Sequence, residues 1–516
     1  KEEPISRSDL PSGTQVIGTM MVYKAKADKL GMLAKIKARL LLLGNQQKSL
    51  GLTRADSYSP VMKAVTLRIF LTLYCGDPEV TFHQLDIDSA YLTANVRRET
   101  FIFLPARLRP KSHPPDSVYQ LLKALYGGAD SGRCFYDDYL DYHLRLGFKQ
   151  IPHEPCYLKY THADGSFIVI CYYVDDGVYA QKGERLWNWY INNLKKKYSY
   201  RLGPLEHFLG LRLRRMVNGD WHIDLEAQVE RMLRTFQLEN AKTKPHPVHP
   251  YRPMPEDAPQ GKEAIDKASR FPMMAAVGHL NYLQQMLEWS ITYPLKVASK
   301  TVRAGTHGNA HHEWIKHIMC FLKSKAWSRY VIYAQPRDKL ILSAYTDADH
   351  IKAVDDRRSL SGHMILLGLT VIQWGATYQT IASHSSAESE LMALDTCARK
   401  VQAMIWLVEA MECPHQPAVK IYVDCDSAIT MAENFIPSTR SAHIHMRFFY
   451  VRQLHDESIV KIERVDTKEQ LADLLVTFKD KHNFDHLMCA SRGYDARLIQ
   501  RDEFPTSWRQ RRTAAG

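Results

Sequence analysis

The sequence lacks an apolar run long enough to cross a membrane. A membrane-spanning helix needs about 20 consecutive apolar residues, whereas the longest run here, 167–174, has the length and β-branched composition of a strand. The chain begins with Lys1 and has no charged-then-apolar leader. We therefore expect no membrane association and no secretion, and a segment trimmed or processed from something longer.

Cysteine is sparse and its spacing forms no recognisable pair. The nine cysteines are an odd number, are widely scattered and include no Cys-x-x-Cys. Zinc ribbons and redox motifs need such pairs, so we expect a reducing compartment. His311, His312, His443 and His445 also lack zinc-ligand spacing and are expected to be surface or structural residues.

Disorder and low complexity are excluded as global states by the composition. The 516 residues are 45% hydrophobic and 24% charged, which is globular composition and enough for three or four domains. Lys and Arg number 68 against 56 Asp and Glu, a net charge of +12. This excess favours a polyanionic partner, although a solvated surface would give the same balance.

Hydrophobic periodicity predicts the elements of the first 150 residues. We expect a hairpin from 16–23 and 36–43, a buried helix over 67–75, a strand over 82–87, a proline-broken loop over 105–115 and a helix over 134–146.

Adjacent carboxylates stand between two β-rich runs. Asp175-Asp176-Gly177 separates 167–174 from 178–180, which predicts a β-hairpin with acids at its tip, and Asp86 lies near the end of an earlier strand. Neighbouring carboxylates repel unless a cation lies between them. Two Mg²⁺ ions about 4 Å apart could activate a 3′-hydroxyl and stabilise a departing pyrophosphate. The alternative is a solvated turn.

The second half of the chain is expected to begin with a proline-rich segment and to continue with helices and then a mixture of strands and helices. Residues 242–260 hold six prolines and two histidines and are expected to be a linker or surface excursion, with helices following to about 322. Strands are expected over 340–346, 363–367, 371–374 and 420–423, a helix over 388–411, and a basic tail from about 481.

A second group of acids lies among these later elements. Asp347 and Asp424 each follow an apolar strand, Glu390 stands in the first turns of a helix, and Asp473 lies downstream. Carboxylates that share one cleft would form a second magnesium site. Each acid taken alone could instead be an N-cap or a surface residue.

Ordered blocks of sequence resemble one known family. V-T-F-H-Q-L-D-I-D-S-A-Y-L (80–92), L-L-K-A-L-Y (121–126), Y-V-D-D (173–176) and F-L-G (208–210) resemble blocks of copia-type LTR-retrotransposon reverse transcriptases. A-V-G-H-L-N-Y-L (276–283), D-A-D (347–349), R-R-S-x-S-G (357–362) and S-S-A-E-S-E (385–390) resemble the tether and ribonuclease H blocks of that family. The blocks keep the family's order over nearly the whole chain.

The resemblance implies an α+β fold, a right-hand polymerase of fingers, palm and thumb followed by an α/β ribonuclease H-like domain. The implied domains are fingers and palm at 1–195, primer-grip hairpin and thumb at 196–300, connection at 301–338, ribonuclease H-like domain at 339–480 and basic tail at 481–516.

The resemblance also assigns the two groups of acids. Asp86, Asp175 and Asp176 would be the polymerase carboxylates, and Asp347, Glu390, Asp424 and Asp473 those of ribonuclease H. Glu390 is preferred over Glu388 because it opens the E-L-M-A pattern. Each site would hold two Mg²⁺, with Mn²⁺ as the alternative ion.

Binding residues follow from the same blocks. Lys37 and Arg39 of K-A-R-L would meet the incoming triphosphate. Ala90 and Tyr91 would line the nucleotide pocket, where the tyrosine ring would clash with a 2′-hydroxyl. A solvated strand face and a core tyrosine are the alternatives.

The residues Phe208, Leu209 and Gly210 would grip the primer end, although an ordinary turn would have the same sequence pattern.

The chain also departs from the family at several positions. Residues 128–133 (G-A-D-S-G-R) replace L-K-Q-A-P-R near the nucleotide pocket, and Leu43-Gly44 loses a lysine. H-I-H-M-R (443–447) and Asp349-His350 replace H-I-D-I-R and D-W.

The function implied is an RNA-directed DNA polymerase whose ribonuclease H domain removes the copied RNA. Its partners would be an RNA template, a DNA or RNA primer, the RNA–DNA hybrid and dNTPs, with a homodimer left open. It would act in the cytoplasm within a virus-like particle, or in the nucleus. The alternatives are a non-catalytic nucleic-acid-binding or assembly protein and a template-independent nucleotidyltransferase.

Overall fold

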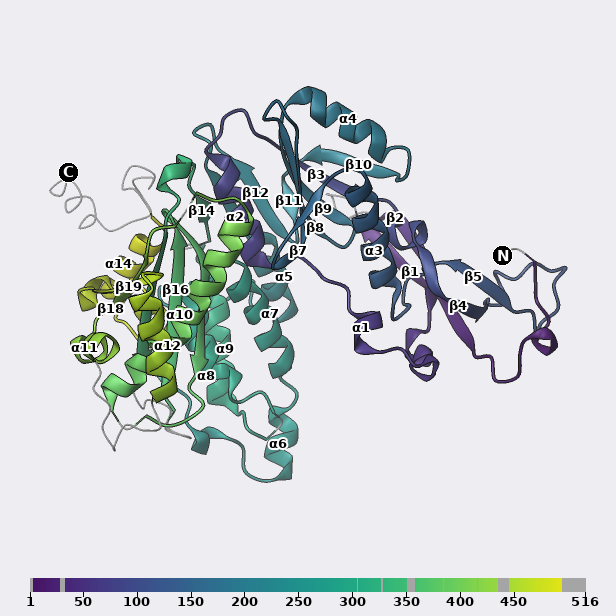
Figure 1. Ribbon diagram of the computed structural model, residues 1–516. Coiled ribbons are helices and arrows are strands. Elements are labelled where there is room, and N and C mark those ends of the chain that lie inside the picture. Colours follow the sequence, from purple (N-terminus) through teal and green to yellow (C-terminus); the bar gives the residue numbers. More distant parts are fainter. Residues whose placement is uncertain are drawn as a thin grey trace. The chain divides into compact units, whose positions relative to one another are not determined.

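The computed structural model describes residues 3–27, 33–303, 305–325, 328–349, 358–383, 385–414, 416–434 and 445–493. The chain forms two compact units (Figure 1). Unit 1 contains residues 1–63 and 79–205, and unit 2 contains residues 64–78 and 206–516. Arg357, His443, His350 and residues 508–512 of the expected basic tail lie outside the described residues.

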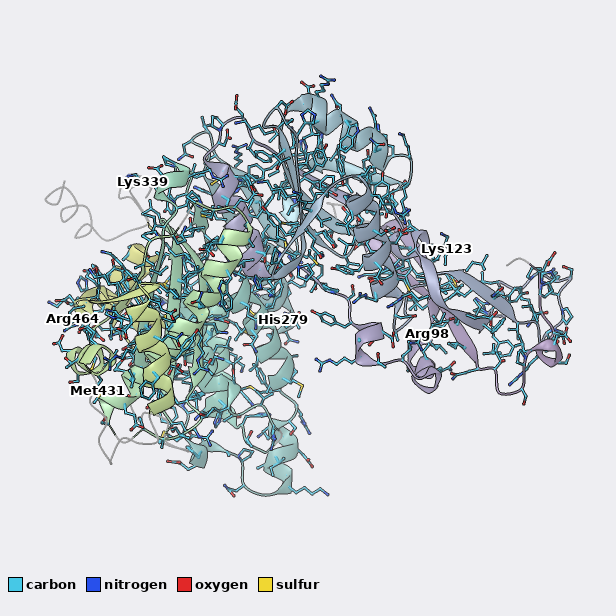
Figure 2. The ribbon with its side chains drawn as sticks, in the orientation of Figure 1. Arg98, Lys123, His279, Lys339, Met431 and Arg464 are labelled. Atoms are coloured by element: carbon cyan, nitrogen blue, oxygen red, sulfur yellow. The ribbon has the colours of Figure 1, made fainter. Side chains whose placement is uncertain are left out.

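Unit 1 contains a four-stranded sheet near the N-terminus. Its order is β2-β1-β4-β5, from β1 (Val16–Ala27), β2 (Leu33–Leu42), β4 (Asn95–Phe103) and β5 (Tyr119–Lys123). The expected first hairpin is confirmed, because β1 and β2 pair antiparallel. Arg98 on β4 pairs with Asp56 at 2.9 Å, and Lys123 on β5 donates to the Thr93 carbonyl at 2.9 Å (Figure 2).

A six-stranded sheet forms the rest of unit 1. Its order is β10-β3-β9-β8-β7-β6, from β3 (Thr81–Ile87), β6 (Lys149–Ile151), β7 (Glu154–Thr161), β8 (Phe167–Tyr173), β9 (Asp176–Lys182) and β10 (Tyr200–Pro204). The hairpin with acids at its tip is confirmed in β8 and β9. Its turn is one residue earlier than expected, since Asp176 already pairs with Tyr173.

Helices α1 (Arg54–Ser57), α3 (Ser131–Arg145) and α4 (Glu184–Leu194) complete unit 1. An aromatic network joins α3 and α4 to β9: the hydroxyls of Tyr139 and Tyr179 lie 2.9 Å apart, and His143 Nε2 lies 2.9 Å from the Tyr190 hydroxyl. Side chains alternate along a strand, so Asp176 projects from the opposite face to Tyr179. The helices therefore leave the carboxylate face uncovered.

Unit 2 begins with α2 (Ala64–Cys75), the buried helix expected from the sequence. Its Arg68 guanidinium donates to the carbonyls of Met286 at 2.7 Å and Ile372 at 2.9 Å, and lies 4.0 Å from the ring centroid of Trp374. These contacts join α2 to segments more than 200 residues later in the chain. Arg68 is therefore a structural residue of unit 2.

A small sheet and a group of helices follow. The sheet order is β11-β12-β13-β14, from β11 (His207–Phe208), β12 (Leu211–Arg215), β13 (Trp221–Asp224) and β14 (Tyr330–Ile332). The helices are α5 (Glu226–Thr235), α6 (Lys262–Ala268), α7 (Met273–Met286), α8 (Thr292–Ser299) and α9 (Asn309–Leu322). The block resembling the family's tether falls in α7, where the His279 ring lies 5.9 Å from that of Phe236 (Figure 2).

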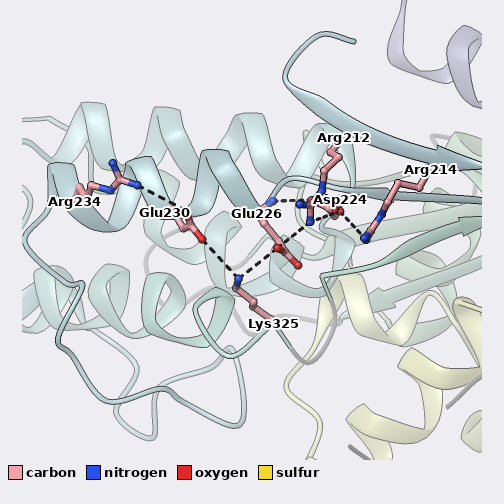
Figure 3. Close-up of polar contacts among 7 residues, drawn as sticks. All are labelled: Arg212, Arg214, Asp224, Glu226, Glu230, Arg234 and Lys325. Atoms are coloured by element: carbon pink, nitrogen blue, oxygen red, sulfur yellow. Dashed lines mark hydrogen bonds and ion pairs between the residues drawn. The ribbon is translucent and has the colours of Figure 1, made fainter. Parts of the chain in front are cut away.

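Ion pairs link the small sheet to α5 (Figure 3). Asp224 is only 2% exposed and pairs with Arg212 at 2.9 Å and Arg214 at 3.3 Å. Glu226 pairs with Arg212 at 2.9 Å and with Lys325 at 3.3 Å. Because Asp224 has two cationic partners, its buried charge is compensated, and the β12–β13 hairpin is fixed to the start of α5.

The last part of unit 2 is a five-stranded mixed sheet in the order β17-β16-β15-β18-β19. The strands are β15 (Leu342–Asp349), β16 (Leu360–Leu367), β17 (Thr370–Tyr378), β18 (Val419–Val423) and β19 (Val460–Arg464), accompanied by α10 (Ser386–Ala410), α11 (Asp426–Asn434), α12 (His445–Asp456), α13 (Asp473–Val476) and α14 (Lys481–Ser491). β15, β16 and β17 pair antiparallel, whereas β15, β18 and β19 pair parallel. The expected α+β fold class is confirmed.

Two expectations from composition can be compared with the described residues. None of their helices combines the length and apolar character that spanning a bilayer requires. Eight of the cysteines are buried, Cys425 is half-buried, and all nine are free thiols. His311 and His312, expected at the surface or in a structural role, are buried on α9.

Candidate active sites

Three strands bring the first group of acids together. Asp86 on β3 lies opposite Asp176 on β9, and Arg201 on β10 lies opposite Asp86. Cross-strand partners project from the same face of a sheet, so Arg201, Asp86 and Asp176 form a row across this face. Asp175 joins them at the β8–β9 tip, where its carbonyl accepts from the Ile87 N–H at 3.0 Å.

The hairpin tip has a strained backbone. Val174, between Tyr173 and Asp175, has φ of +58°. A β-branched residue in this region costs on the order of 1–3 kcal/mol and persists only where its surroundings enforce it. Pairing of β8 with β9, and of β9 with β3, supplies that constraint and fixes the direction of the Asp175 side chain.

The charges of this group are incompletely balanced. Burial raises the pKa of Asp176 to about 6, and the carboxylates of Asp86 and Asp175 add to the rise. Burial also raises the pKa of Asp86, while the Arg201 guanidinium, which forms an ion pair with its Oδ2, opposes the rise. Arg201 Nε also lies 3.4 Å from Asp88. Such carboxylates would gain stability from a divalent cation, so the residues fit Mg²⁺.

The expected nucleotide-binding residues lie in the same unit. Lys37 and Arg39 lie on one face of β2. The positive charge of Lys37 acts to lower the pKa of Asp86, against the effect of burial. Arg39 lies over the Tyr126 ring, 5.2 Å from its centroid, and its Nε is buried without a hydrogen-bond partner. An unsatisfied buried donor is the kind of group that a phosphate oxygen would complete.

Ala90 and Tyr91 begin a 3-10 helix, Ala90–Thr93, directly after the Asp86 strand. Ala90 is buried, whereas Tyr91 is half-buried with its ring 5.0 Å from that of Tyr126. Burial is the main cause that raises the pKa of Tyr91, and the negative charge of Asp175 raises it further. The Tyr91 hydroxyl is therefore within electrostatic reach of Asp175. The ring is therefore supported on one side and partly accessible.

The structure shows the surroundings of two stretches where the chain departs from the family. A Cβ on Gly44 would lie 2.2 Å from the Gly127 carbonyl, so close packing explains the glycine that this chain shares with the family, whereas nothing in the structure explains the leucine at position 43. In the altered loop 128–133, the Ala129 N–H donates to Gln47 at 2.7 Å and Arg133 donates to Asp137 at 2.8 Å. The Arg133 guanidinium is thus engaged within its own helix.

The expected primer-binding turn lies in unit 2. Phe208 is buried at the end of β11, and Leu209 and Gly210 have φ of +48° and +75°. The Tyr282 hydroxyl donates to the Leu209 carbonyl at 2.5 Å. The positive φ of Gly210 favours glycine, and a Cβ there would also meet the ends of the Gln228 and Tyr282 side chains, at 2.7 Å from Nε2 and 2.9 Å from the hydroxyl.

The second group of acids is gathered more tightly. Asp347 on β15, Glu390 on α10 and Asp424 after β18 place carboxylate oxygens within 4.8 Å of one another. The first group is not gathered this closely among the described residues. Ser385 caps α10 by accepting from the Glu388 N–H at 3.1 Å. Glu388 thus lies in the capping turn, and Glu390 is the acid that joins the group.

Burial dominates the electrostatics of this second group. It raises the pKa of Asp347 well above its usual range, with Glu390 as the next cause, and raises the pKa of Glu390 to about 8. Glu390 Oε2 is buried without a hydrogen-bond partner. Three clustered hard oxygen donors and an unsatisfied buried oxygen fit a divalent metal such as Mg²⁺.

Asp473 begins α13 and is positioned by close packing. A Cβ on Gly362 would lie 2.6 Å from Val476 Cγ1 and 3.3 Å from the Ala472 carbonyl, so the glycine of the R-R-S-x-S-G block lets α13 approach β16. Asp473 hydrogen-bonds to Asp347, and its Oδ2 lies 2.5 Å from Lys479 Nζ.

Sequence reasoning missed three residues that contact these groups. These residues are Arg201, Lys479 and Gln470, and none of them is among the site residues expected from the sequence. Gln470 Nε2 donates to the Thr346 carbonyl at 3.0 Å, next to Asp347. The Arg201 contact follows from strand register, which could have been used once β10 was predicted.

Comparison with known proteins shows what the chain is similar to. Residues 5–250 match the family described as reverse transcriptase (RNA-dependent DNA polymerase). The chain is similar to the retrovirus-related Pol polyprotein from transposon TNT 1-94 of Nicotiana tabacum, with 26% identity over 92% of this chain and 36% of that protein. It is also similar to that from transposon RE1 of Arabidopsis thaliana, with 26% identity over 90% of this chain and 31% of that protein.

These matches confirm the resemblance to copia-type LTR-retrotransposon reverse transcriptases. The chain spans about a third of the length of the two relatives. Among solved structures, a foamy viral protease-reverse transcriptase in complex with double-stranded DNA has a TM-score of 0.49 and 12% identity, covering 90% of this chain and 67% of that one.

Proposed function

We propose that this chain is an RNA-directed DNA polymerase whose ribonuclease H-like region degrades the RNA of the RNA–DNA hybrid. The observation that carries the proposal is the pairing of Asp86 with Asp176 beside Asp175, within the region that matches the reverse transcriptase family. The division into fingers and palm, thumb, connection and ribonuclease H-like domain is part of this proposal. Residues 481–491, expected to begin a basic tail, instead form helix α14 with its large apolar side chains buried.

In the polymerase site, Asp86, Asp175 and Asp176 would hold two Mg²⁺ ions. Divalent ions supply Lewis-acid activation of the 3′-hydroxyl and charge stabilisation at the phosphates. Lys37 and Arg39 bind the triphosphate, and Tyr91 excludes ribonucleotides through contact with the 2′-hydroxyl. Phe208, Leu209 and Gly210 hold the primer end.

In the second site, Asp347, Glu390, Asp424 and Asp473 would hold the metal, with Mn²⁺ as an alternative to Mg²⁺. The protein's contribution is to hold the carboxylates of Asp347, Glu390 and Asp424 close together, with Asp473 beside Asp347, in a mostly buried site where charges are weakly screened. The substrate is the RNA strand of the hybrid, and water is the nucleophile.

The partners are an RNA template, a DNA or RNA primer, dNTPs and the hybrid product. The net charge of +12 supports a polyanionic partner. We place the protein in the cytoplasm within a virus-like particle, with a nuclear location as the alternative.

The two activities are tested together on a 5′-labelled RNA template with a DNA primer, dNTPs and Mg²⁺. Asp176→Asn is expected to stop DNA synthesis while fragments of RNA still appear on preformed hybrid. Glu390→Gln is expected to do the reverse. Loss of both activities in each variant, or of neither, would contradict the assignment of two separate sites.

A further inference from the structure

The connection between α13 and α14 carries a lysine that faces the second group of acids. This connection is short and consists of residues 477–480. Lys479 Nζ lies 2.5 Å from Asp473 Oδ2, and Asp473 also hydrogen-bonds to Asp347. An ammonium group of the chain is therefore in direct contact with a carboxylate proposed to hold metal.

The ion pair is mostly withdrawn from solvent. The Lys479 side chain is 21% exposed and the Asp473 side chain 7%. Water screens such a pair less than it screens an exposed one. The acids whose oxygens lie within 4.8 Å of one another are Asp347, Glu390 and Asp424. Asp473, which stands beside this group of three, is paired with a cation of the chain itself.

The helices fix both ends of the connection. The Thr477 N–H donates to the Asp473 carbonyl at 3.2 Å, which ties the start of the connection to α13. Asp480 caps α14 by accepting from the Asn483 N–H at 3.0 Å. Lys479 lies between these two fixed points, so its backbone has little freedom to move away from Asp473.

The proline-rich segment 242–260 holds the connection from a third side. The centroid of the His246 ring lies 5.3 Å from that of Phe478 and 4.8 Å from that of Phe484, and both contacts are edge to face. Phe478 directly precedes Lys479, and Phe484 lies near the start of α14. The His246 ring therefore joins the connection to the helix that follows it.

His246 is in turn held by its neighbours. His317 Nε2 on α9 donates to the His246 carbonyl at 2.9 Å, which fixes the backbone. The Val248 N–H donates to His246 Nδ1 at 3.1 Å, which fixes the direction of the ring. Burial lowers the pKa of His246, so the ring is neutral at pH 7 and packs between two phenyl rings without burying a charge.

A lysine in contact with a metal-binding carboxylate either supports or opposes the metal. Lys479 is in contact with Asp473 Oδ2 itself, so its ammonium group shields that oxygen and repels a divalent ion at the same carboxylate. Mg²⁺ binds carboxylate oxygens directly and demands near-ideal geometry around itself. The position of Lys479 therefore favours competition over support.

We propose that Lys479 is a tethered counter-ion of Asp473 that competes with a divalent cation for this carboxylate, and that His246 of the proline-rich segment holds Lys479 in that position. The inference rests on the proposed function, because it takes the second group of acids as a metal site. A divalent ion then gains Asp473 as a ligand only after the Lys479 side chain moves away. His246 is a positioning residue that acts through Lys479.

The test measures Mn²⁺ binding to the full chain, without nucleic acid, by isothermal titration calorimetry. The parent and all variants carry Asp86→Asn and Asp176→Asn, so that the first group of acids contributes little. Lys479→Gln is expected to bind Mn²⁺ about tenfold more tightly, because a charged contact no longer has to be broken. Lys479→Arg keeps the cation and should stay close to the parent. Lys481→Gln is the matched control, because Lys481 pairs with Asp485 at 2.6 Å two residues further along.

The part played by His246 is measured in the same titration. His246→Ala is expected to tighten Mn²⁺ binding about threefold, because Lys479 would be held less firmly. In the Lys479→Gln background the same change should have no further effect, since residues that act through one another are not additive. His279→Ala is the control, because it removes another edge-to-face contact with a phenylalanine of unit 2, Phe236.

The outcomes separate this inference from the proposed function. Unchanged or weaker Mn²⁺ binding in Lys479→Gln would overturn the competition at Asp473. A full effect of His246→Ala in the Lys479→Gln background would overturn its action through Lys479. Neither result touches the proposed function. If neither the parent nor Lys479→Gln showed Mn²⁺ binding that Glu390→Gln abolishes, the second metal site itself would be overturned. A circular-dichroism melt shows whether each variant is folded, and Lys479→Ala provides a second neutral substitution.

Discussion

Asp86 on β3 and Asp176 on β9 lie directly opposite one another in the six-stranded sheet, with Arg201 of β10 on the other side of Asp86. Like charges opposite one another on neighbouring strands destabilise a sheet, and an adjacent cation offsets part of that cost. Because Arg201 forms an ion pair with Asp86 Oδ2, it would compete with a divalent ion for that oxygen.

Removal of Arg201 is therefore expected to favour metal binding. Arg201→Gln should raise the affinity for Mn²⁺ about two- to fivefold in the absence of nucleotide, the range of an exposed ion pair. Electron paramagnetic resonance of free Mn²⁺ measures this affinity. Arg145→Gln removes another exposed Arg–Asp pair from unit 1 and should have no effect. Weaker Mn²⁺ binding in Arg201→Gln would show that the arginine supports the metal site.

The raised pKa of Glu390 predicts an unusual pH dependence of stability. Its pKa is about 8 in the folded chain and near 4.5 when unfolded, so the folded state binds more protons between these values. The free energy of unfolding of the metal-free protein should therefore fall as pH rises from about 4.5 through 8. Glu390→Gln should flatten this decline in urea titrations. An equal decline in the variant would assign the effect to other groups.

Substitution of Arg68, which lies in neither group of acids, is expected to lower the free energy of unfolding strongly. Arg68→Met would leave the carbonyls of Met286 and Ile372 without their donor and remove the contact with Trp374. We expect a loss of about 3 kcal/mol or more, since unsatisfied buried groups cost about 1–3 kcal/mol each. Urea unfolding measures it. Arg234→Gln, which removes an exposed pair with Glu230, should cost under about 1 kcal/mol.

Substitution of Gly210 is expected to weaken binding of the primer. In Gly210→Ala the methyl group would meet Gln228 and Tyr282, and the residue would keep a positive φ only with strain. We expect weaker binding of the primer terminus, measured as a raised KM for primer-template. Gly203→Ala on β10 has open space around its Cβ and serves as the control. Equal KM values in the two variants would contradict a role for this turn at the primer.

Local patterns in the sequence predicted local elements well. The hairpins around 16–43 and 167–182 follow from alternation of period two, and the helix over 388–411 follows from an apolar face of period 3.6. The family pattern favours Glu390 over Glu388, and in the structure Glu390 is the one of the two that lies with Asp347 and Asp424. The capping hydrogen bond from Ser385 supplies the physical reason.

Contacts between distant segments could not be predicted from those patterns. Nothing near Arg68 in sequence indicates that it lies against Trp374, because this contact depends on how α2 packs in unit 2. The proline-rich segment has the composition of a linker, yet Asp257 accepts from the Met254 N–H within it and packs its carbonyl against Gly308 at the start of α9. Lys479 contacts Asp473 only because α13 packs against β16 at Gly362.

The most direct test of the central claim is primer extension on an RNA template with Mg²⁺ and dNTPs, comparing the intact chain with Asp176→Asn and Asp86→Asn. The account predicts DNA complementary to the template from the intact chain, and in each variant a loss larger than the roughly 10- to 100-fold caused by removing a residue that only supports a metal ligand. Tight binding of primer-template without nucleotide addition by the intact chain would contradict the account. Template-dependent extension that persists in both variants would contradict it equally.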